Sequence, residues 1–223
     1  MGRYTVIACK VMEEEILSLA PQGYELHFLN SELHRSPERL RQALQEAIDC
    51  ASGSDFILLG YGLCGGALEG LRARTTPLVI PKVDDCIPLL LGSWEARRQW
   101  GLDTYFLSAG WLAGEDNLIR EYERCLARYG KERGRRIMRH LFCHYRRLMF
   151  INTGRLGEEV AKEAAREVAE KLGLSFEITS GNKNYLRQLL LGPWDYQFWK
   201  VQPGQEVLLA GLHDCSAGGN QLR

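Results

Sequence analysis

One stretch decides the fold: Phe56-Ile57-Leu58-Leu59-Gly60-Tyr61-Gly62-Leu63-Cys64-Gly65-Gly66. Its unbroken apolar run predicts a strand buried on both faces, as in the interior of a parallel sheet. The run then enters four glycines arranged around one cysteine. Glycine permits positive φ and close backbone approach. We therefore expect Cys64 on a tight turn between this strand and a following helix.

Two further cysteines follow strands in the same way. Cys9 comes directly after the expected strand 4–8, and Cys86 lies shortly after the expected strand 78–80. In doubly wound sheets the first, third and fourth strands are commonly neighbours, and ligands bind just outside the carboxyl ends of the strands. We therefore expect all three cysteines at one edge of a sheet.

Strands and helices alternate along the chain. Strands are expected at 4–8, 24–29, 56–59, 78–80, 104–108, 148–151, 175–179 and 198–201, the last in a hairpin with 206–210. This order predicts the α/β class, with a mostly parallel, doubly wound sheet or sheets and helices on both faces. We expect an N-terminal lobe over 1–112 that carries the cysteine site, followed over 113–223 by a helical insertion and a second, smaller α/β lobe. Two facing Rossmann-like lobes and one continuous domain both fit this pattern.

Charge and composition exclude several classes of protein. The 28 basic and 28 acidic residues cancel, which argues against nucleic acid and anionic membranes as partners. The N-terminus lacks the pattern of a signal peptide, and no apolar run reaches the ~20 residues of a membrane span. We therefore expect a cytoplasmic protein. Its seven cysteines are then metal-bound, reactive or buried rather than paired in disulfides. The oligomeric state stays open.

Three thiols near one point favour metal or iron–sulfur ligation by Cys9, Cys64 and Cys86. Thiolates repel one another unless a cation holds them, and a bound metal deprotonates its thiols. Iron–sulfur clusters and zinc are the leading candidates for such ligands. The fourth ligand is open; Cys143 and His144 are candidates, although an expected helix contains both.

Two alternatives to metal binding remain. The first is a metal-free module that binds a small ligand or a corrinoid, with the cysteines only lining its pocket. The second is a transferase with Cys64 as nucleophile, its thiolate stabilised by the N-terminus of the helix expected after it. Whether the protein is an enzyme is open; if so, it is a metal-dependent transferase or a redox enzyme.

Residues around the cysteines complete the candidate site. Tyr61 either presents its phenol to the site or covers it, and Asp85 is a general base or a helix cap. Polar turns after strands can bind anions through their N–H groups. The expected catalytic residues are Cys64, Tyr61 and Asp85. The expected cofactor-binding residues are Gly60, Gly62, Gly65, Gly110, Asn152, Thr153 and Gly154. His27 and His34 lie close together, a pattern also common for exposed histidines.

Several motifs resemble a known family. They are Ile7-Ala8-Cys9, Ser36-Pro37-Glu38-Arg39-Leu40, Leu59-Gly60-Tyr61-Gly62-Leu63-Cys64-Gly65, Asp85-Cys86 and Leu91-Gly92-Ser93. They make the chain similar to the DUF1638 family. The resemblance implies a role in anaerobic one-carbon metabolism beside corrinoid-dependent methyltransferases, with a corrinoid protein or a methyltransferase as partner. It assigns no role to any residue, so the site is inferred from the cysteines.

Overall fold

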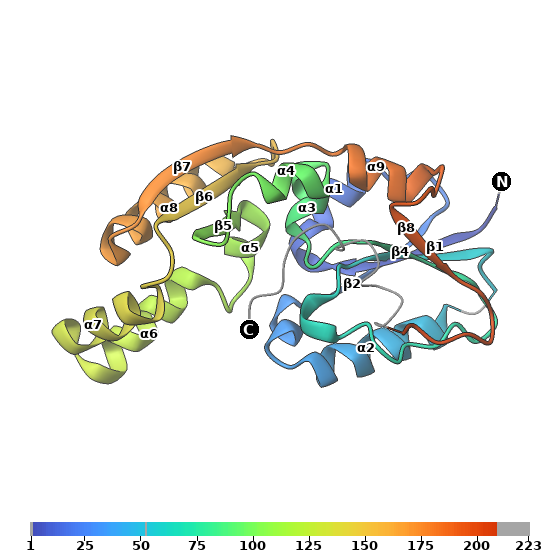
Figure 1. Cartoon of the computed structure of the whole chain (residues 1–223), viewed down its shortest axis with the longest axis horizontal. Helices are drawn as coiled ribbons and strands as arrows, with labels where there is room; N and C mark the ends of the chain where they lie inside the picture. The colour runs from blue at the N-terminus through green and yellow to red at the C-terminus, as the bar shows by residue number, and fades with distance from the viewer. Residues whose placement is uncertain (1, 52, 209–223) are drawn as a thin grey trace.

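The structure, a computed structural model, describes residues 2–51 and 53–208 and contains two sheets (Figure 1). The five-stranded sheet has the order β2-β1-β3-β4-β8. Its strands are β1 (Tyr4–Cys9), β2 (Glu25–Leu29), β3 (Phe56–Gly60), β4 (Leu78–Pro81) and β8 (Phe198–Val201). The three-stranded sheet orders β5 (Thr104–Ser108), β6 (Arg147–Asn152) and β7 (Ser175–Ser180). Only β8 runs antiparallel to its neighbour. The expected α/β class with mostly parallel sheets is confirmed.

Helices cover both faces of the five-stranded sheet, and together they form the first lobe. Helix α2 (Pro37–Cys50) lies on one face, while α3 (Ile87–Leu91) and α9 (Asn184–Leu191) lie on the other (Figure 1). The Ser36 hydroxyl accepts the Arg39 N–H at the start of α2, which satisfies one of the unpaired donors of the first turn. Leucines and an isoleucine at helical spacing then bury one side of α2.

The second lobe consists of the three-stranded sheet and its helices. Along β6, Leu148 and Phe150 pack in the core of this lobe, whereas Met149 and Ile151 belong to the core of the first lobe. Leu148 and Phe150 lie in the same hydrophobic core as buried residues of α8 (Glu158–Leu172). Helices α6 (Leu118–Tyr129) and α7 (Lys131–Leu141) form a hairpin at the far end (Figure 1). Because successive residues of β6 pack in both cores, the two lobes are joined by side-chain packing.

The second lobe is inserted between β4 and β8 of the first. Strand β5 lies within residues 1–112, the segment expected to form the first lobe, but it belongs to the sheet of the second lobe. Strand β8 lies within 113–223 but belongs to the sheet of the first lobe. The expected hairpin of 198–201 with 206–210 is wrong within the described residues, because β8 pairs with β4 and Glu206 forms an isolated bridge with Arg72. Residues 209–210 lie outside the described residues. Pairing with β8 covers an edge of β4 that would otherwise expose unpaired backbone groups.

The carboxyl ends of the two sheets face each other where the lobes meet. Gly110, in α5 (Ala109–Ala113) after β5, lies so close to Val11 that a Cβ atom would be 1.9 Å from the Val11 carbonyl oxygen. After β7, the Asn182 N–H donates to the Leu90 carbonyl oxygen over 2.8 Å. Ligands of open α/β sheets bind at such edges, so a ligand at this lobe junction could touch both lobes.

The polar turn after β6 is also part of the lobe junction. The Thr153 hydroxyl donates to Glu15 of α1 (Glu13–Leu17) over 2.6 Å. The backbone N–H groups of Thr153 and Gly154 donate to the Glu158 carboxylate over 2.7 and 3.0 Å, and Gly154 also donates to Asn152. Glu158 thus supplies the negative charge that an anionic cofactor would bring to this turn.

Among the described residues, no helix is long and apolar enough to span a bilayer.

Replacing Thr153 with valine should weaken the lobe junction. The change keeps the shape of the side chain but removes the donor to the buried Glu15 carboxylate. Leaving a buried acceptor without its partner costs about 1–3 kcal/mol, which urea unfolding followed by circular dichroism would measure. Thr179→Val, at a partly exposed position of β7, should change stability by less than ~0.5 kcal/mol. Equal effects of the two substitutions would contradict this role of Thr153.

Candidate functional site

The three cysteines follow three adjacent, parallel strands. Cys9 is the last residue of β1, while Cys64 and Cys86 lie in the loops after β3 and β4. The strand order β1-β3-β4 confirms the expected adjacency, so the three loops leave the same edge of the sheet. Burial raises the pKa of the Tyr61 phenol well above its ordinary value, and all three cysteines raise it further.

Backbone contacts hold the loops after β3 and β4 together. The Leu63 and Cys64 N–H groups donate to the Val83 and Asp84 carbonyl oxygens, each over 2.9 Å. At Gly62 a Cβ atom would lie 2.6 Å from the Asp85 nitrogen. Only glycine lets the two backbones approach this closely. The spacing between Cys64 and Cys86 is therefore fixed by main-chain packing.

Cys64 has an unusual backbone conformation. With φ 45 it is the only non-glycine residue with positive φ in the described ranges, and Gly65 and Gly66 follow at φ 69 and 87. The three form the 3-10 turn η3 (Cys64–Gly66), so the α-helix expected after Cys64 is absent from this position. A side chain in this conformation costs about 1–2 kcal/mol relative to the right-handed one. Strain of this kind is typical of functional sites.

Each thiol combines burial with an N–H donor. Burial raises the pKa of Cys9 to about 11, that of Cys64 to about 12, and that of Cys86 well above its ordinary value. A nearby N–H group opposes this shift at each cysteine: the backbone N–H of Val11 lowers the pKa of Cys9, that of Gly62 lowers the pKa of Cys64, and the Trp111 side chain lowers the pKa of Cys86.

Thiolates at this site therefore require a nearby cation. A nucleophilic Cys64 would need a lowered pKa instead. The structure offers neither that shift nor the helix N-terminus expected to provide it.

Aromatic side chains pack on one another after strands β2, β3 and β5. Tyr61 is 1 % exposed, and its hydroxyl has no hydrogen-bond partner within the described part of the chain. The ring of His34 stacks on Tyr61 with 6.0 Å between centroids and meets Trp111 edge to face at 5.6 Å. Sequence reasoning gave no role to His34 or Trp111. Both residues lie shortly after a strand, and the three cysteines were selected as candidates because they occupy the same kind of position. This criterion would also have identified His34 and Trp111.

The remaining expected residues take up distinct places. Gly60 lies against Ala8 in the sheet, where a Cβ would be 2.6 Å from the alanine Cβ, and Gly65 belongs to η3. Asp85 lies one residue before the N-cap Cys86 of α3 and accepts the Ile87 N–H over 2.8 Å, and burial raises its pKa. Gly110 and the turn 152–154 lie at the lobe junction. Cys143 and His144 are exposed on the second lobe, whereas Cys9 and Cys86 are buried and Cys64 is partly buried.

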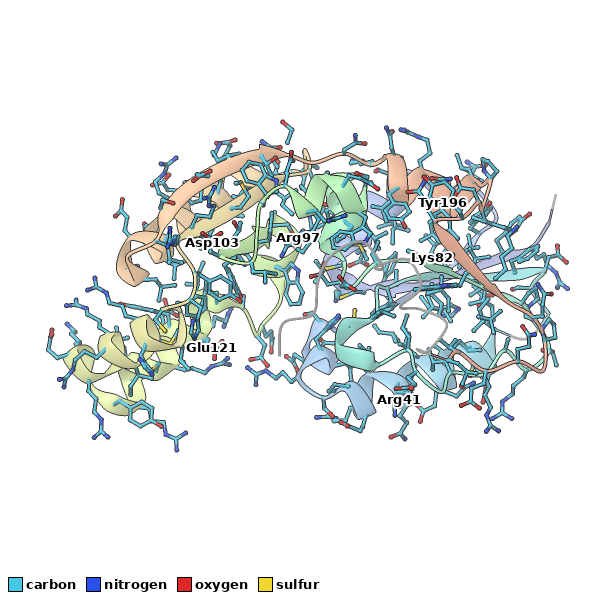
Figure 2. All side chains as sticks on the ribbon, in the orientation of Figure 1. Arg41, Lys82, Arg97, Asp103, Glu121 and Tyr196 are labelled. Carbon is cyan, nitrogen blue, oxygen red and sulfur yellow. The ribbon has the colours of Figure 1, made fainter. Side chains whose placement is uncertain are left out.

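A cavity of about 250 Å³ adjoins Cys86. Arg97 of α4 (Trp94–Arg98) lines it, and Figure 2 shows this residue where the lobes meet. Its guanidinium lies over the Phe106 ring at 4.7 Å and donates to the Gly101 carbonyl oxygen. Other lining residues are Asp85, Ile87, Thr104, Tyr105, Leu107, Trp111 and Tyr145. Pockets for drug-sized ligands measure about 300–1,000 Å³, so this cavity fits a small molecule and is too small to enclose a whole corrinoid.

In the described ranges, no group of three or more His, Cys, Asp or Glu side chains is placed so that it could hold a metal ion. The family model described as "Protein of unknown function (DUF1638)" matches residues 28–190, more than half of the chain. The chain belongs to the DUF1638 family. The DUF1638 match includes Cys64 and Cys86 and begins after Cys9. No curated protein and no solved structure matches the chain.

Proposed function

We propose that the protein is a cytoplasmic metalloprotein that holds an iron–sulfur cluster or a single metal ion through Cys9, Cys64 and Cys86. The observation that carries this proposal is the conformation of Cys64. Glycine would occupy φ 45 without strain, yet the chain places a thiol there, between two other strand-end cysteines. A thiol that served only to fill space would not need this costly position.

The surroundings of the thiols support the same function. Three thiolates are the ligands that iron–sulfur clusters and zinc prefer. N–H groups near the sulfurs tune such centres, and one such group lowers the pKa of each cysteine. The thiols must lose their protons as the metal binds.

When bound, a cluster would supply electron transfer or substrate activation, and zinc would activate a thiol acceptor for methylation. The cavity beside Cys86 gives a small substrate access to the centre, with Arg97 available for a negative group. The DUF1638 membership supports a place in anaerobic one-carbon metabolism, beside a corrinoid protein or a methyltransferase. That assignment rests on association and not on any contact in the site.

Elemental analysis and visible spectroscopy test the proposal on the full chain purified without oxygen. Iron with broad thiolate-to-iron absorption, or zinc in stoichiometric amount, is the expected result. Protein that contains no metal, and takes up neither iron with sulfide nor zinc after reduction, would overturn it. The cavity would then favour a metal-free module that binds a small ligand. Ligand-induced quenching of tryptophan fluorescence would detect such binding, because Trp111 lines the cavity.

Replacing Trp111 with phenylalanine should leave the metal in place and change its properties. The substitution removes the indole N–H that lowers the pKa of Cys86 but keeps an aromatic ring. An N–H donor stabilises added negative charge on the sulfur, so its loss should lower the reduction potential of a cluster. Redox titration of the purified variant measures this change, with Trp100→Phe as control. An unchanged or higher potential would contradict the role given to Trp111.

A further inference from the structure

The cavity beside Cys86 has two opposite charges on its wall. Asp85 lines it from the loop after β4, and Arg97 lines it from α4. Both side chains are partly buried. Within the part of the chain that the structure describes, neither forms an ion pair with the other or with a third residue. A ligand in the cavity therefore meets a carboxylate and a guanidinium that have not neutralised each other.

The contacts of the two charged groups leave hydrogen-bonding capacity for a ligand. The Arg97 guanidinium lies over the Phe106 ring and donates one N–H to the Gly101 carbonyl oxygen over 3.1 Å. A guanidinium has five N–H donors, so the others stay available. One Asp85 oxygen accepts the Ile87 N–H, which leaves the second oxygen. Burial raises the pKa of Asp85, while the Ile87 N–H and the charge of Arg97 lower it, so the two charges interact without an ion pair.

Aromatic side chains form much of the remaining wall. Tyr105 of β5, Trp111 of α5 and Tyr145 line the cavity together with Phe106, whose ring already carries the Arg97 guanidinium. Burial raises the pKa of Tyr105 to about 12, with a further contribution from Tyr145, so the Tyr105 phenol stays neutral near pH 7. Aromatic rings attract cationic groups. A positively charged group would therefore be attracted by these rings as well as by Asp85, and a negative group by Arg97.

We propose that the cavity binds a small zwitterion, with its carboxylate on Arg97 and its cationic nitrogen beside Asp85. A ligand with only a negative charge would be repelled by Asp85, and one with only a positive charge by Arg97. A zwitterion satisfies both groups, so the cavity selects against either single charge. The volume of about 250 Å³ limits the ligand to a small molecule. This inference rests on the proposed function in taking the cavity as the substrate site, but it requires no bound metal.

Titration of the full chain with simple probes tests the charge selectivity. Alanine, β-alanine and 4-aminobutyrate are zwitterions with increasing separation of charge, while butyrate and butylamine each carry one charge. Tryptophan fluorescence reports binding because Trp111 lines the cavity, and calorimetry gives the affinity. We expect at least one zwitterion to bind about tenfold or more tightly than both singly charged probes. Equal affinity for butyrate or butylamine, or no binding of any zwitterion, would overturn the inference.

Two substitutions should shift the selectivity in opposite directions. Asp85→Asn keeps an oxygen for the Ile87 N–H and removes the charge, so it should weaken the zwitterion about tenfold and strengthen butyrate. Arg97→Gln should weaken the zwitterion to a similar extent and strengthen butylamine. Arg98→Gln is the matched control, because Arg98 lies over the Trp94 ring and does not line the cavity. Loss of affinity for all probes alike in Asp85→Asn would contradict the proposed arrangement.

Metal analysis of the same preparation separates this inference from the proposed function. Protein that binds a zwitterion but contains and takes up no metal would overturn the metalloprotein and leave the zwitterion site in place. Protein that holds a metal but binds no zwitterion would do the reverse. Circular dichroism of each variant establishes that it folds. If Arg97→Gln does not fold, the opposite responses of Asp85→Asn to the zwitterion and to butyrate decide.

Discussion

Replacing Cys64 with glycine should abolish metal binding without destabilising the metal-free chain. The substitution removes one thiolate of the proposed centre. It also relieves backbone strain, because at φ 45 a residue with a side chain pays about 1–2 kcal/mol that glycine does not. This gain offsets two losses: the packing of the thiol and the greater conformational freedom of glycine in the unfolded chain. Metal analysis should therefore show loss of the bound metal, and urea unfolding of the metal-free protein a change within about 1 kcal/mol.

Two comparisons make this prediction specific. Cys9→Ser and Cys86→Ser should also lose the metal, because each removes a thiolate at the same edge. Cys50→Ser, at the exposed end of α2, should keep it. Full metal content in Cys64→Gly would remove Cys64 from the centre. A strong loss of stability in the metal-free variant would show that the thiol itself holds the turn in place.

Replacing Gly110 with alanine should strongly destabilise the protein. The new Cβ would meet the Val11 carbonyl oxygen at 1.9 Å, a backbone atom that cannot rotate away. Overpacking of this kind costs about 1–3 kcal/mol and occasionally more; a clash with main chain at the lobe junction belongs at the upper end. Chemical denaturation would measure the loss. Metal content should fall as well, because Val11 follows shortly after Cys9 and its N–H lowers the pKa of that thiol.

Gly114→Ala provides the matched control in the same region. Its Cβ would lie 3.0 Å from the Ser31 hydroxyl oxygen, which belongs to a side chain that can turn aside. The backbone of Gly114 has φ −69, an ordinary value for alanine. We therefore expect little change. Comparable destabilisation by both alanines would mean that the close approach of Gly110 to Val11 does not hold the lobes together.

The strand pattern and the cysteine edge could be predicted because both depend on local sequence. The apolar run at 56–59 and the glycines after it predict a buried strand and a tight turn, and the usual order of doubly wound strands predicts that three cysteines meet. The pairing of β8 with β4 could not be predicted, since it joins segments more than a hundred residues apart and neither carries a signal for the other.

The parts of the site that sequence missed depend on tertiary contacts. Nothing near His34 in the sequence shows that its Nδ1 meets a carbonyl or that its ring packs on Tyr61. The turn at 152–154 was expected to bind a cofactor because its N–H groups resemble an anion site. In the fold a glutamate four residues farther along, Glu158, takes those N–H groups. A sequence pattern identifies possible N–H donors, but it does not show which acceptor they bind in the folded protein.

The three N–H donors to the thiols differ in one respect. Val11 and Gly62 belong to the same lobe as the cysteines they contact, whereas Trp111 reaches Cys86 from the other lobe. A change in the packing of one lobe against the other would therefore alter the surroundings of Cys86 and leave those of Cys9 and Cys64 as they are. Of the three thiols, Cys86 is the one whose properties depend on the junction between the lobes.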